Sequence, residues 1–196
     1  MGLILLLGGA RSGKSALAQR IGLAWGGDVV VIATGEPRDE DFARRISRHR
    51  AERPPAWRTV EEPLALAAAI GDVDDGAFLV IECLTLWVAN LLAAGRDEEA
   101  VLASAAGAAR LAAGRAGPTV AVSNEVGLGV HPATPSGREF RDVLGRVNRS
   151  WAEAAEQSLL VVAGRALPLL APEAVLRSTA AGSGGPRPSG HEREAG

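Results

Sequence analysis

Apolar residues along the 196-residue chain gather in five short runs, separated by longer segments in which apolar positions recur every three or four residues. The runs occupy residues 3–7, 29–33, 78–82, 119–123 and 159–163. Such runs predict buried strands, and their alternation with helical segments predicts an α/β domain with a mostly parallel central sheet and flanking helices. In such a domain, ligands bind at the carboxyl ends of the strands.

Helices are predicted between these runs, over residues 39–53, 64–70, 84–92 and 97–115. A further helix is expected behind Ser136, which together with Glu139 has the form of a capping box. From Arg177 onward, glycine, serine, proline and charged residues dominate the sequence. We therefore expect a single nucleotide-binding domain over residues 1–176 and a disordered tail over residues 177–196.

A glycine-rich turn joins the first predicted strand to a helix-forming segment over residues 16–20. It reads G-x-x-x-x-G-K-S and consists of Gly8, Gly9, Ala10, Arg11, Ser12, Gly13, Lys14 and Ser15. Glycines let successive backbone N–H groups point inward, and the following helix adds its positive N-terminal end. The pattern predicts a phosphate-binding P-loop in which Lys14 contacts the β and γ phosphates and Ser15 binds Mg²⁺. Lys14 is the single lysine among 21 basic residues, at a position where arginine would not fit as well beneath phosphates.

The overall composition narrows the range of partners. A net charge near -2 provides no general attraction to nucleic acid or to an anionic membrane, so we expect small-molecule partners. The one cysteine, Cys83, allows no internal disulfide, and no apolar run has the length of a membrane span. Met1 leads directly into a core strand rather than into a charged leader. These features predict a cytoplasmic protein.

His49 is a candidate nucleophile on the predicted helix 39–53. On a helical wheel it shares an arc of about 60° with Phe42, Ile46 and Arg53, which places it on the inward face. A neutral imidazole can attack phosphorus while neighbouring arginines stabilise the charge on the phosphoryl oxygens. The alternative is a packed or half-exposed histidine without a chemical role.

Two carboxylates stand at positions where strands end or loops begin. Glu82 closes the third apolar run, where it would bind Mg²⁺ directly or through water, or else be a structural carboxylate. Glu61 precedes Pro63, and its position alone favours a solvated acid without a chemical role. Asn124 and Glu125 follow the fourth run at the same edge, where they would face a substrate or form a turn.

A series of short motifs in this order resembles a known enzyme family. The motifs are Gly8 to Ser15, Ile32-Ala33-Thr34, Arg45-Ile46 with His49, Arg53-Pro54, Trp57-Arg58-Thr59 with Glu61, Glu82-Cys83-Leu84-Thr85, Asn90-Leu91-Leu92, Asn124-Glu125-Val126-Gly127 and Gly145-Arg146-Val147-Asn148. Over residues 3–170 the chain resembles the bifunctional adenosylcobinamide kinase/adenosylcobinamide-phosphate guanylyltransferases of cobalamin biosynthesis. The resemblance implies a P-loop NTPase-type (RecA-like) fold.

The resemblance also implies two reactions. In the first, the γ-phosphoryl group of ATP or GTP is transferred to the hydroxyl of the aminopropanol arm of adenosylcobinamide. In the second, GMP from GTP is joined to adenosylcobinamide phosphate through a guanylyl-histidine intermediate, and pyrophosphate is released. The family also implies Mg²⁺ as cofactor and a homotrimer.

The resemblance also implies which residues of this chain form the site, because each occupies the matching position in a family motif. The guanylylated histidine corresponds to His49, and the position before it, often a second histidine in the family, is Arg48 here. The implied nucleotide-binding residues are Gly8 to Ser15, Ala33, Thr34, Gly35, Arg50, Ala51, Glu52, Arg53, Glu61 and Glu82. Guanine presents N1–H and N2–H₂ as adjacent donors, so a carboxylate such as Glu61 would select it over adenine.

Two other functions are compatible with the P-loop. One is a small-molecule kinase without nucleotidyl transfer, in which His49 is inert. The other is a nucleotide-dependent regulatory module that hydrolyses slowly and signals through its conformation. Because γ-transfer and attack by His49 involve different phosphorus atoms, we expect the His49 helix or the nucleotide to move between the two steps.

Overall fold

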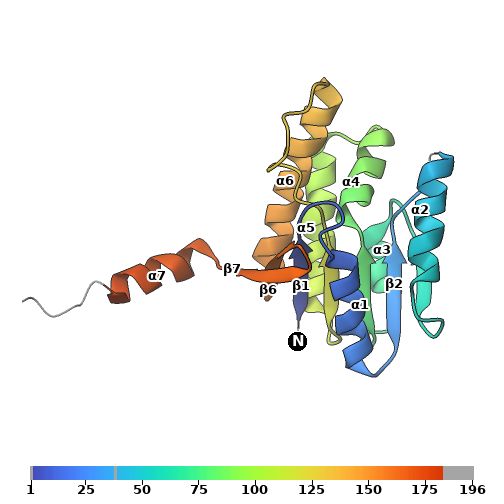
Figure 1. Ribbon diagram of the computed structural model, residues 1–196, viewed down its shortest axis with the longest axis horizontal. Helices are drawn as coiled ribbons and strands as arrows, with labels where there is room; N and C mark the ends of the chain where they lie inside the picture. Colours follow the sequence, from blue (N-terminus) through green and yellow to red (C-terminus); the bar gives the residue numbers. More distant parts are fainter. Residues whose placement is uncertain (1, 38, 183–196) are drawn as a thin grey trace, which may run out of the picture.

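The structure, a computed structural model, describes residues 2–37 and 39–182 (Figure 1). Its seven strands form one sheet in the order β3-β2-β4-β5-β1-β6-β7. The strands are β1 (Leu3–Leu7), β2 (Val29–Ala33), β3 (Arg58–Glu61), β4 (Phe78–Glu82), β5 (Thr119–Val122), β6 (Gln157–Val162) and β7 (Arg165–Leu169). All neighbouring pairs are parallel except β6 and β7, which form an antiparallel hairpin.

Helices cover both faces of the sheet. They are α1 (Lys14–Trp25), α2 (Glu40–Ala51), α3 (Leu66–Gly71), α4 (Leu84–Ala93), α5 (Glu98–Gly114), α6 (Pro135–Ala154) and α7 (Pro172–Gly182). Side chains of α3, α4, α5 and α6 join the larger buried cluster on one face, and α1 packs on the other face. The α/β architecture with a mostly parallel central sheet is therefore confirmed.

All five predicted strands are present, and two more were missed. β3 is a four-residue edge strand without a buried side chain, so it lacks the apolar run that identifies a core strand. Every residue of β7 is exposed, and it contains Pro168, which argues against a strand. Pro168 is tolerated there because β7 lies at the edge of the sheet.

The start of α6 differs from its prediction. The N-cap of α6 is Thr134, whose side chain accepts a hydrogen bond from the N–H of Gly137, and Pro135 follows at the first helical position. The predicted capping box at Ser136 is therefore wrong. α7, which was not predicted, continues past Arg177 to Gly182, beyond the residue at which the tail was expected to begin. Residues 183–196 lie outside the described residues.

Figure 1 shows α7 extending away from the sheet after β7. Among the described residues, no helix has the length and apolar character needed to cross a membrane.

Candidate active site

The P-loop follows β1 and wraps around the ammonium group of Lys14. Lys14 is 6% exposed, and its Nζ donates hydrogen bonds to the carbonyl oxygens of Gly8 at 2.9 Å and Gly9 at 2.7 Å. Gly8 and Gly13 have φ values of 150° and 104°, in the region that favours glycine. A Cβ on Gly8 would lie 2.3 Å from the carbonyl oxygen of Val161, so the loop permits no side chain there. The glycines and Lys14 of this segment therefore give the loop its conformation.

The N-terminus of α1 lacks the groups that usually neutralise a helix end. Its N-cap, Gly13, provides no side-chain hydrogen bond, and no acidic residue lies in its first turn. By contrast, Asp97 caps α5 and is followed there by Glu98 and Glu99. Because helix N-terminal N–H groups attract anions, the end of α1 is prepared to accept phosphate oxygens.

The turn between β6 and β7 supports the P-loop from the side. The N–H of Gly164 donates a 2.8 Å hydrogen bond to the carbonyl oxygen of Ser12. Ala163 and Gly164 have φ values of 49° and 72°, as a two-residue hairpin turn requires. This contact was not predicted, because Ala-Gly is not one of the residue pairs typical of such turns.

A second group of predicted residues lies across β3, β2 and β4. Ala33 is in register with Glu61 on one side and with Glu82 on the other. The two carboxylates thus flank the end of β2, where Thr34 is fully buried and Gly35 follows. The carboxyl edge of the sheet brings together residues that are far apart in sequence.

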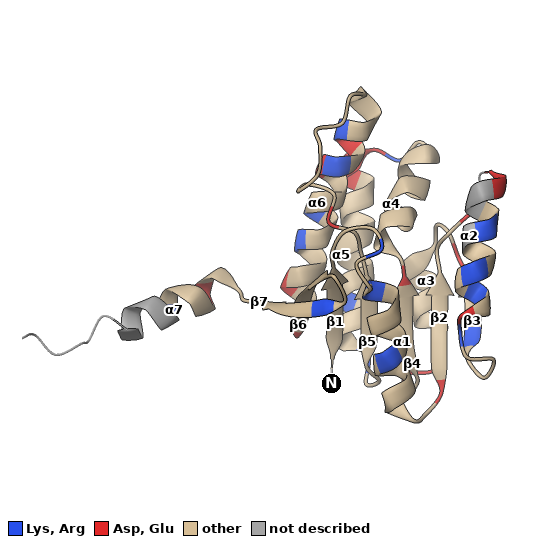
Figure 2. Cartoon of the chain, in the orientation of Figure 1, with Lys and Arg blue, Asp and Glu red and all other residues tan. Residues whose placement is uncertain are grey.

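The last turn of α2 pairs with these carboxylates. Arg50 Nη1 donates to Glu61 Oε1 at 2.9 Å, and Arg53, just beyond the helix, donates from Nη2 to Glu82 Oε2 at 3.0 Å. The side chains of Arg50 and Glu61 are 67% and 59% exposed, whereas those of Arg53 and Glu82 are 9% and 16% exposed. Figure 2 shows basic residues along α2 beside the ends of these strands. Arg53 therefore fixes Glu82, and Arg50 and Glu61 remain accessible.

His49 is on the same turn of α2. Its side chain is 38% exposed, and its Nδ1 lies 3.7 Å from Oε2 of Glu52. Ile46, one turn earlier, has its Cδ1 atom 3.3 Å from the position of a Cβ on Gly35, so α2 packs on the end of β2. Ile46 thus lies on the predicted inward face and His49 is half-exposed beside it, whereas the side chain of Phe42 lies outside the described residues.

The predicted residues form two separate groups at the carboxyl ends of the strands. β4 and β5 lie between β2 and β1 in the sheet. Three strand spacings of about 4.8 Å each separate β2 from β1. The His49 turn and the P-loop are therefore not in contact.

A buried polar network joins the strand ends, and apart from Thr34 its members had no predicted role. Thr34 Oγ1 accepts from the N–H of Cys83 at 2.9 Å and donates to its carbonyl at 2.7 Å. Asn90 Nδ2 donates to the carbonyl of Thr34 at 2.7 Å. A second chain links Thr85, Ser123 and Asn148 at the end of β5. Thr85, Asn90 and Asn148 occur in the family motifs, which was the available signal for them.

Cys83 lies inside this network. Burial raises the pKa of its thiol, and the nearby Glu82 charge raises it further. The thiol is therefore kept protonated, which fits a packing role and no catalytic one.

The residues suited to Mg²⁺ are few. Among the described residues, no three or more His, Cys, Asp or Glu side chains are grouped as a metal site. Mg²⁺ at a nucleotide site needs only one or two protein ligands, because phosphates and water supply the rest. Ser15 and Glu82 therefore fit the ion in kind and number.

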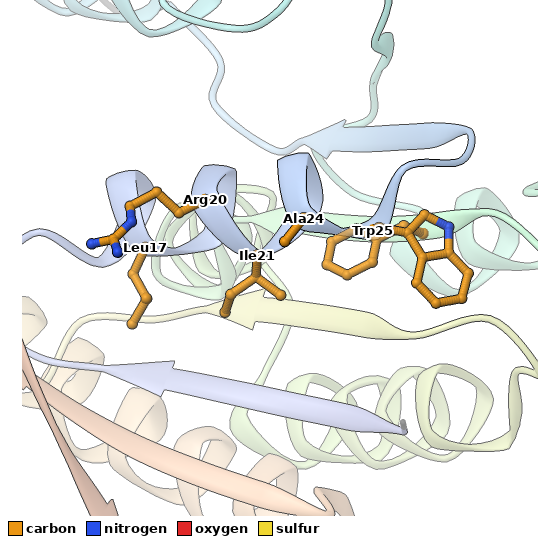
Figure 3. A pocket seen from close by; sticks show the side chains of 6 residues that line it. Leu17, Arg20, Ile21, Ala24 and Trp25 are labelled. Atoms are coloured by element: carbon orange, nitrogen blue, oxygen red, sulfur yellow. The ribbon is translucent and has the colours of Figure 1, made fainter.

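The groove along α1 lies apart from these groups. It has a volume of about 440 Å³ and is lined by Leu17, Arg20, Ile21, Ala24, Trp25 and Phe78 (Figure 3). Its lining is mostly apolar and includes none of the predicted site residues.

Comparison with known proteins agrees with the motif order. The family model described as "Cobinamide kinase / cobinamide phosphate guanyltransferase" matches residues 4–169. The chain is 42% identical over 166 residues to the bifunctional adenosylcobalamin biosynthesis protein CobP of Pseudomonas aeruginosa, covering 84% of this chain and 95% of that protein. It is 37% identical to the bifunctional adenosylcobalamin biosynthesis protein CobU of Escherichia coli, covering 83% and 96% of the two chains.

Solved structures share the fold at low sequence identity. A type III secretion system ATPase superimposes with a TM-score of 0.50 and 15% identity, covering 90% of this chain and 53% of that chain. A Pyrococcus horikoshii protein, PH0250, gives a TM-score of 0.54 and 9% identity, covering 88% of each chain. The predicted P-loop NTPase-type fold is confirmed.

Proposed function

Because the chain belongs to the cobinamide kinase/cobinamide phosphate guanyltransferase family, we propose that its two reactions use two parts of one sheet edge, with Lys14 and His49 as catalytic residues. The chain is a bifunctional transferase of adenosylcobalamin biosynthesis. Family membership does not favour a kinase without nucleotidyl transfer or a regulatory module. The observation that carries the residue assignment is the contact of the last turn of α2 with Glu61 and Glu82, which flank the end of β2.

In the kinase step, the P-loop holds the triphosphate of ATP or GTP. The uncapped end of α1 and the backbone of residues 8–13 bind the phosphate oxygens. Lys14 exchanges its hydrogen bonds to the carbonyls of Gly8 and Gly9 for phosphate oxygens and stabilises charge on the transferred group. The hydroxyl oxygen of the adenosylcobinamide arm bonds to the γ-phosphorus, the bond to the β-γ bridging oxygen breaks, ADP or GDP leaves, and the hydroxyl proton is lost to water.

Mg²⁺ would be held by Ser15 and Glu82. When bound, the ion neutralises charge on the phosphates. Arg53 keeps the Glu82 carboxylate in a fixed position, and the second oxygen of that carboxylate is the one available for the ion or its water.

In the guanylyltransferase step, His49 attacks the α-phosphorus of GTP. A phosphorus–nitrogen bond forms, the bond to the bridging oxygen breaks, and pyrophosphate leaves. An oxygen of adenosylcobinamide phosphate then bonds to the same phosphorus, and His49 is released. The half-exposed position of His49 supports this role, since a nucleophile must reach both substrates.

Guanine recognition is assigned to Glu61. Its pair with Arg50 is exposed, and exposed pairs contribute only about 0–1 kcal/mol. Glu61 can therefore exchange Arg50 for the N1–H and N2–H₂ donors of guanine at little cost. Ala33, Thr34, Gly35, Ala51 and Glu52 complete this part of the nucleotide site.

The separation of the two groups requires a rearrangement between the steps. We assign it to α2, which lies outside β2 and β3 at the margin of the sheet (Figure 1). The proposal also includes a cytoplasmic homotrimer, on the basis of the family resemblance.

Labelling with GTP carrying a radioactive α-phosphate tests the assignment. Wild-type protein should retain label that is stable to base and labile to acid, and His49→Ala should retain none. His131→Ala is the matched control, because His131 lies in the loop before α6 and contacts Arg141. If wild-type protein retains no α-label with Mg²⁺ and GTP present, or if His49→Ala retains it, the covalent role of His49 is wrong.

A further inference from the structure

The loop between β5 and α6 carries the two most exposed large apolar side chains among the described residues. Leu128 is 82% exposed and Val130 is 95% exposed. Gly127 and Gly129 alternate with them, so no larger side chain stands directly before or between these two apolar residues. These two side chains therefore take no part in packing within the described chain and are available to contact another molecule.

This loop is joined directly to the P-loop. The N–H of Glu125 donates a 3.0 Å hydrogen bond to the carbonyl oxygen of Gly8. From Glu125, Leu128 and Val130 are three and five residues along the chain, which spans at most about 10 and 18 Å. The apolar tip is therefore within reach of the γ-phosphate position.

Both ends of the loop are held in place. The Glu125 side chain accepts from the N–H of Gly127 at 2.8 Å. Arg138 donates to the carbonyls of Pro132 and Ala133, each at 3.1 Å, and Arg141 contacts His131 at 2.8 Å. Hydrogen bonds at both ends therefore hold the tip of the loop in place beside the upper end of α6 (Figure 1).

A polar groove of about 420 Å³ adjoins the loop. It is lined by Gly127, Arg141, Asp142, Gly145, Arg146 and Arg149. Each arginine has a carboxylate partner: Asp142 for Arg141, Glu98 for Arg146 and Glu153 for Arg149. Figure 2 shows this mixture of basic and acidic residues on α6. A groove with compensated charges suits neutral amides, which both donate and accept hydrogen bonds, better than it suits a polyanion.

We propose that the tip of this loop, with Leu128 and Val130, and the adjoining α6 groove form the binding surface for the corrinoid acceptor. The inference rests on the proposed function, which supplies the acceptor. A corrinoid is a large macrocycle with apolar edges and carboxamide side arms. Its reacting hydroxyl is at the end of one arm, so the ring must lie some distance from the phosphates. The apolar tip receives the ring edge, and the groove receives carboxamide arms.

The test is the kinase reaction with ATP and cobinamide. Leu128→Ser/Val130→Ser should raise the KM for cobinamide at least tenfold and leave the KM for ATP within twofold. Acceptor-free labelling of His49 by GTP should also be unchanged, because that step needs no corrinoid. The matched control is Leu23→Ser/Leu111→Ser, which removes two exposed leucines on α1 and α5 and should alter neither KM.

Three outcomes would overturn the inference. A KM for cobinamide within twofold of wild type would show that the loop does not bind the acceptor. A change in oligomeric mass of the double variant, measured by light scattering, would show that a second copy of the chain covers the loop instead. Failure of the wild-type protein to phosphorylate cobinamide would reject the proposed function and this inference with it. Because the wild-type reaction is measured first, this outcome is distinguished from a failure of the inference alone.

Discussion

The guanidinium of Arg53 is hydrogen-bonded to the carboxylate of Glu82 at 3.0 Å, with only 9% and 16% of the two side chains exposed. The pair joins the segment after α2 to the end of β4, so it ties the histidine-bearing helix to the sheet. Buried pairs of this kind add little net stability over an apolar pair, but removing one partner leaves a charge without compensation.

Arg53→Met should therefore destabilise the protein by about 3 kcal/mol, because the Glu82 charge remains buried and unpaired. Arg53→Met/Glu82→Gln should recover most of that loss, because no charge is left alone. Urea denaturation of the two variants and of Glu82→Gln gives the coupling energy. A coupling energy of zero would show that the pair is not formed in solution.

The two glycines at the start of the P-loop differ sharply in their surroundings. A Cβ on Gly8 would meet the Val161 carbonyl oxygen at 2.3 Å, whereas a Cβ on Gly9 would meet nothing within 4 Å. Gly8→Ala should lower the free energy of unfolding by about 2 kcal/mol or more and weaken ATP binding, because the loop must shift. Gly9→Ala should unfold like wild type in urea, and equal destabilisation by both variants would contradict the loop geometry.

Most of the sheet could be predicted because its strands are buried on both faces. β1, β2, β4 and β5 are apolar runs, so the pattern alone identifies them. β3 and β7 could not be identified in this way, since edge strands bury little and keep polar residues or proline. The same limit concealed the contact of Gly164 with the P-loop.

The part of the candidate site that lies in one short segment could be predicted from the sequence. The part that depends on contacts between distant residues was harder to predict. The P-loop is continuous in sequence, so its residues were found together. Arg53 and Glu82 are 29 residues apart, and only the packing of α2 on the sheet shows that one fixes the other. Leu128 and Val130 had no signal in the pattern, because exposure of an apolar residue is a property of the folded chain.

Glu61→Gln should loosen the preference for guanine by roughly 10- to 100-fold in the labelling reaction, because an amide offers one acceptor where guanine needs two. The measurement is His49 labelling by GTP in competition with ATP. Arg50→Ala is the matched control, since it removes the partner of Glu61 and leaves the carboxylate. Unchanged discrimination in Glu61→Gln would place guanine recognition elsewhere.

Cys83 should resist alkylation in the folded protein, because burial raises the pKa of its thiol above its usual value of 9.0. The folded state then holds the proton more tightly than the unfolded state. The stability that this provides is complete below pH 9.0 and is lost as the pH rises through the folded pKa. Iodoacetamide at pH 8 should label the folded chain slowly and the urea-unfolded chain quickly, whereas equal rates would show an accessible thiolate. Cys83→Ala should remove this part of the alkaline loss of stability.

Lys14→Ala should abolish phosphoryl transfer, with a fall in kcat/KM for ATP on the order of 10²–10³-fold or more. No other lysine can replace it, since the remaining basic residues other than histidine are arginines. Lys14→Arg should also lose most activity, because the bulky fork of arginine cannot occupy the 6%-exposed position between the carbonyls of Gly8 and Gly9. The single lysine allows a second measurement: an amine-reactive ATP dialdehyde should label Lys14, ATP should protect it, and Lys14→Ala should leave only the α-amino group reactive. Kinase rates close to wild type in Lys14→Ala would contradict the assignment of the P-loop.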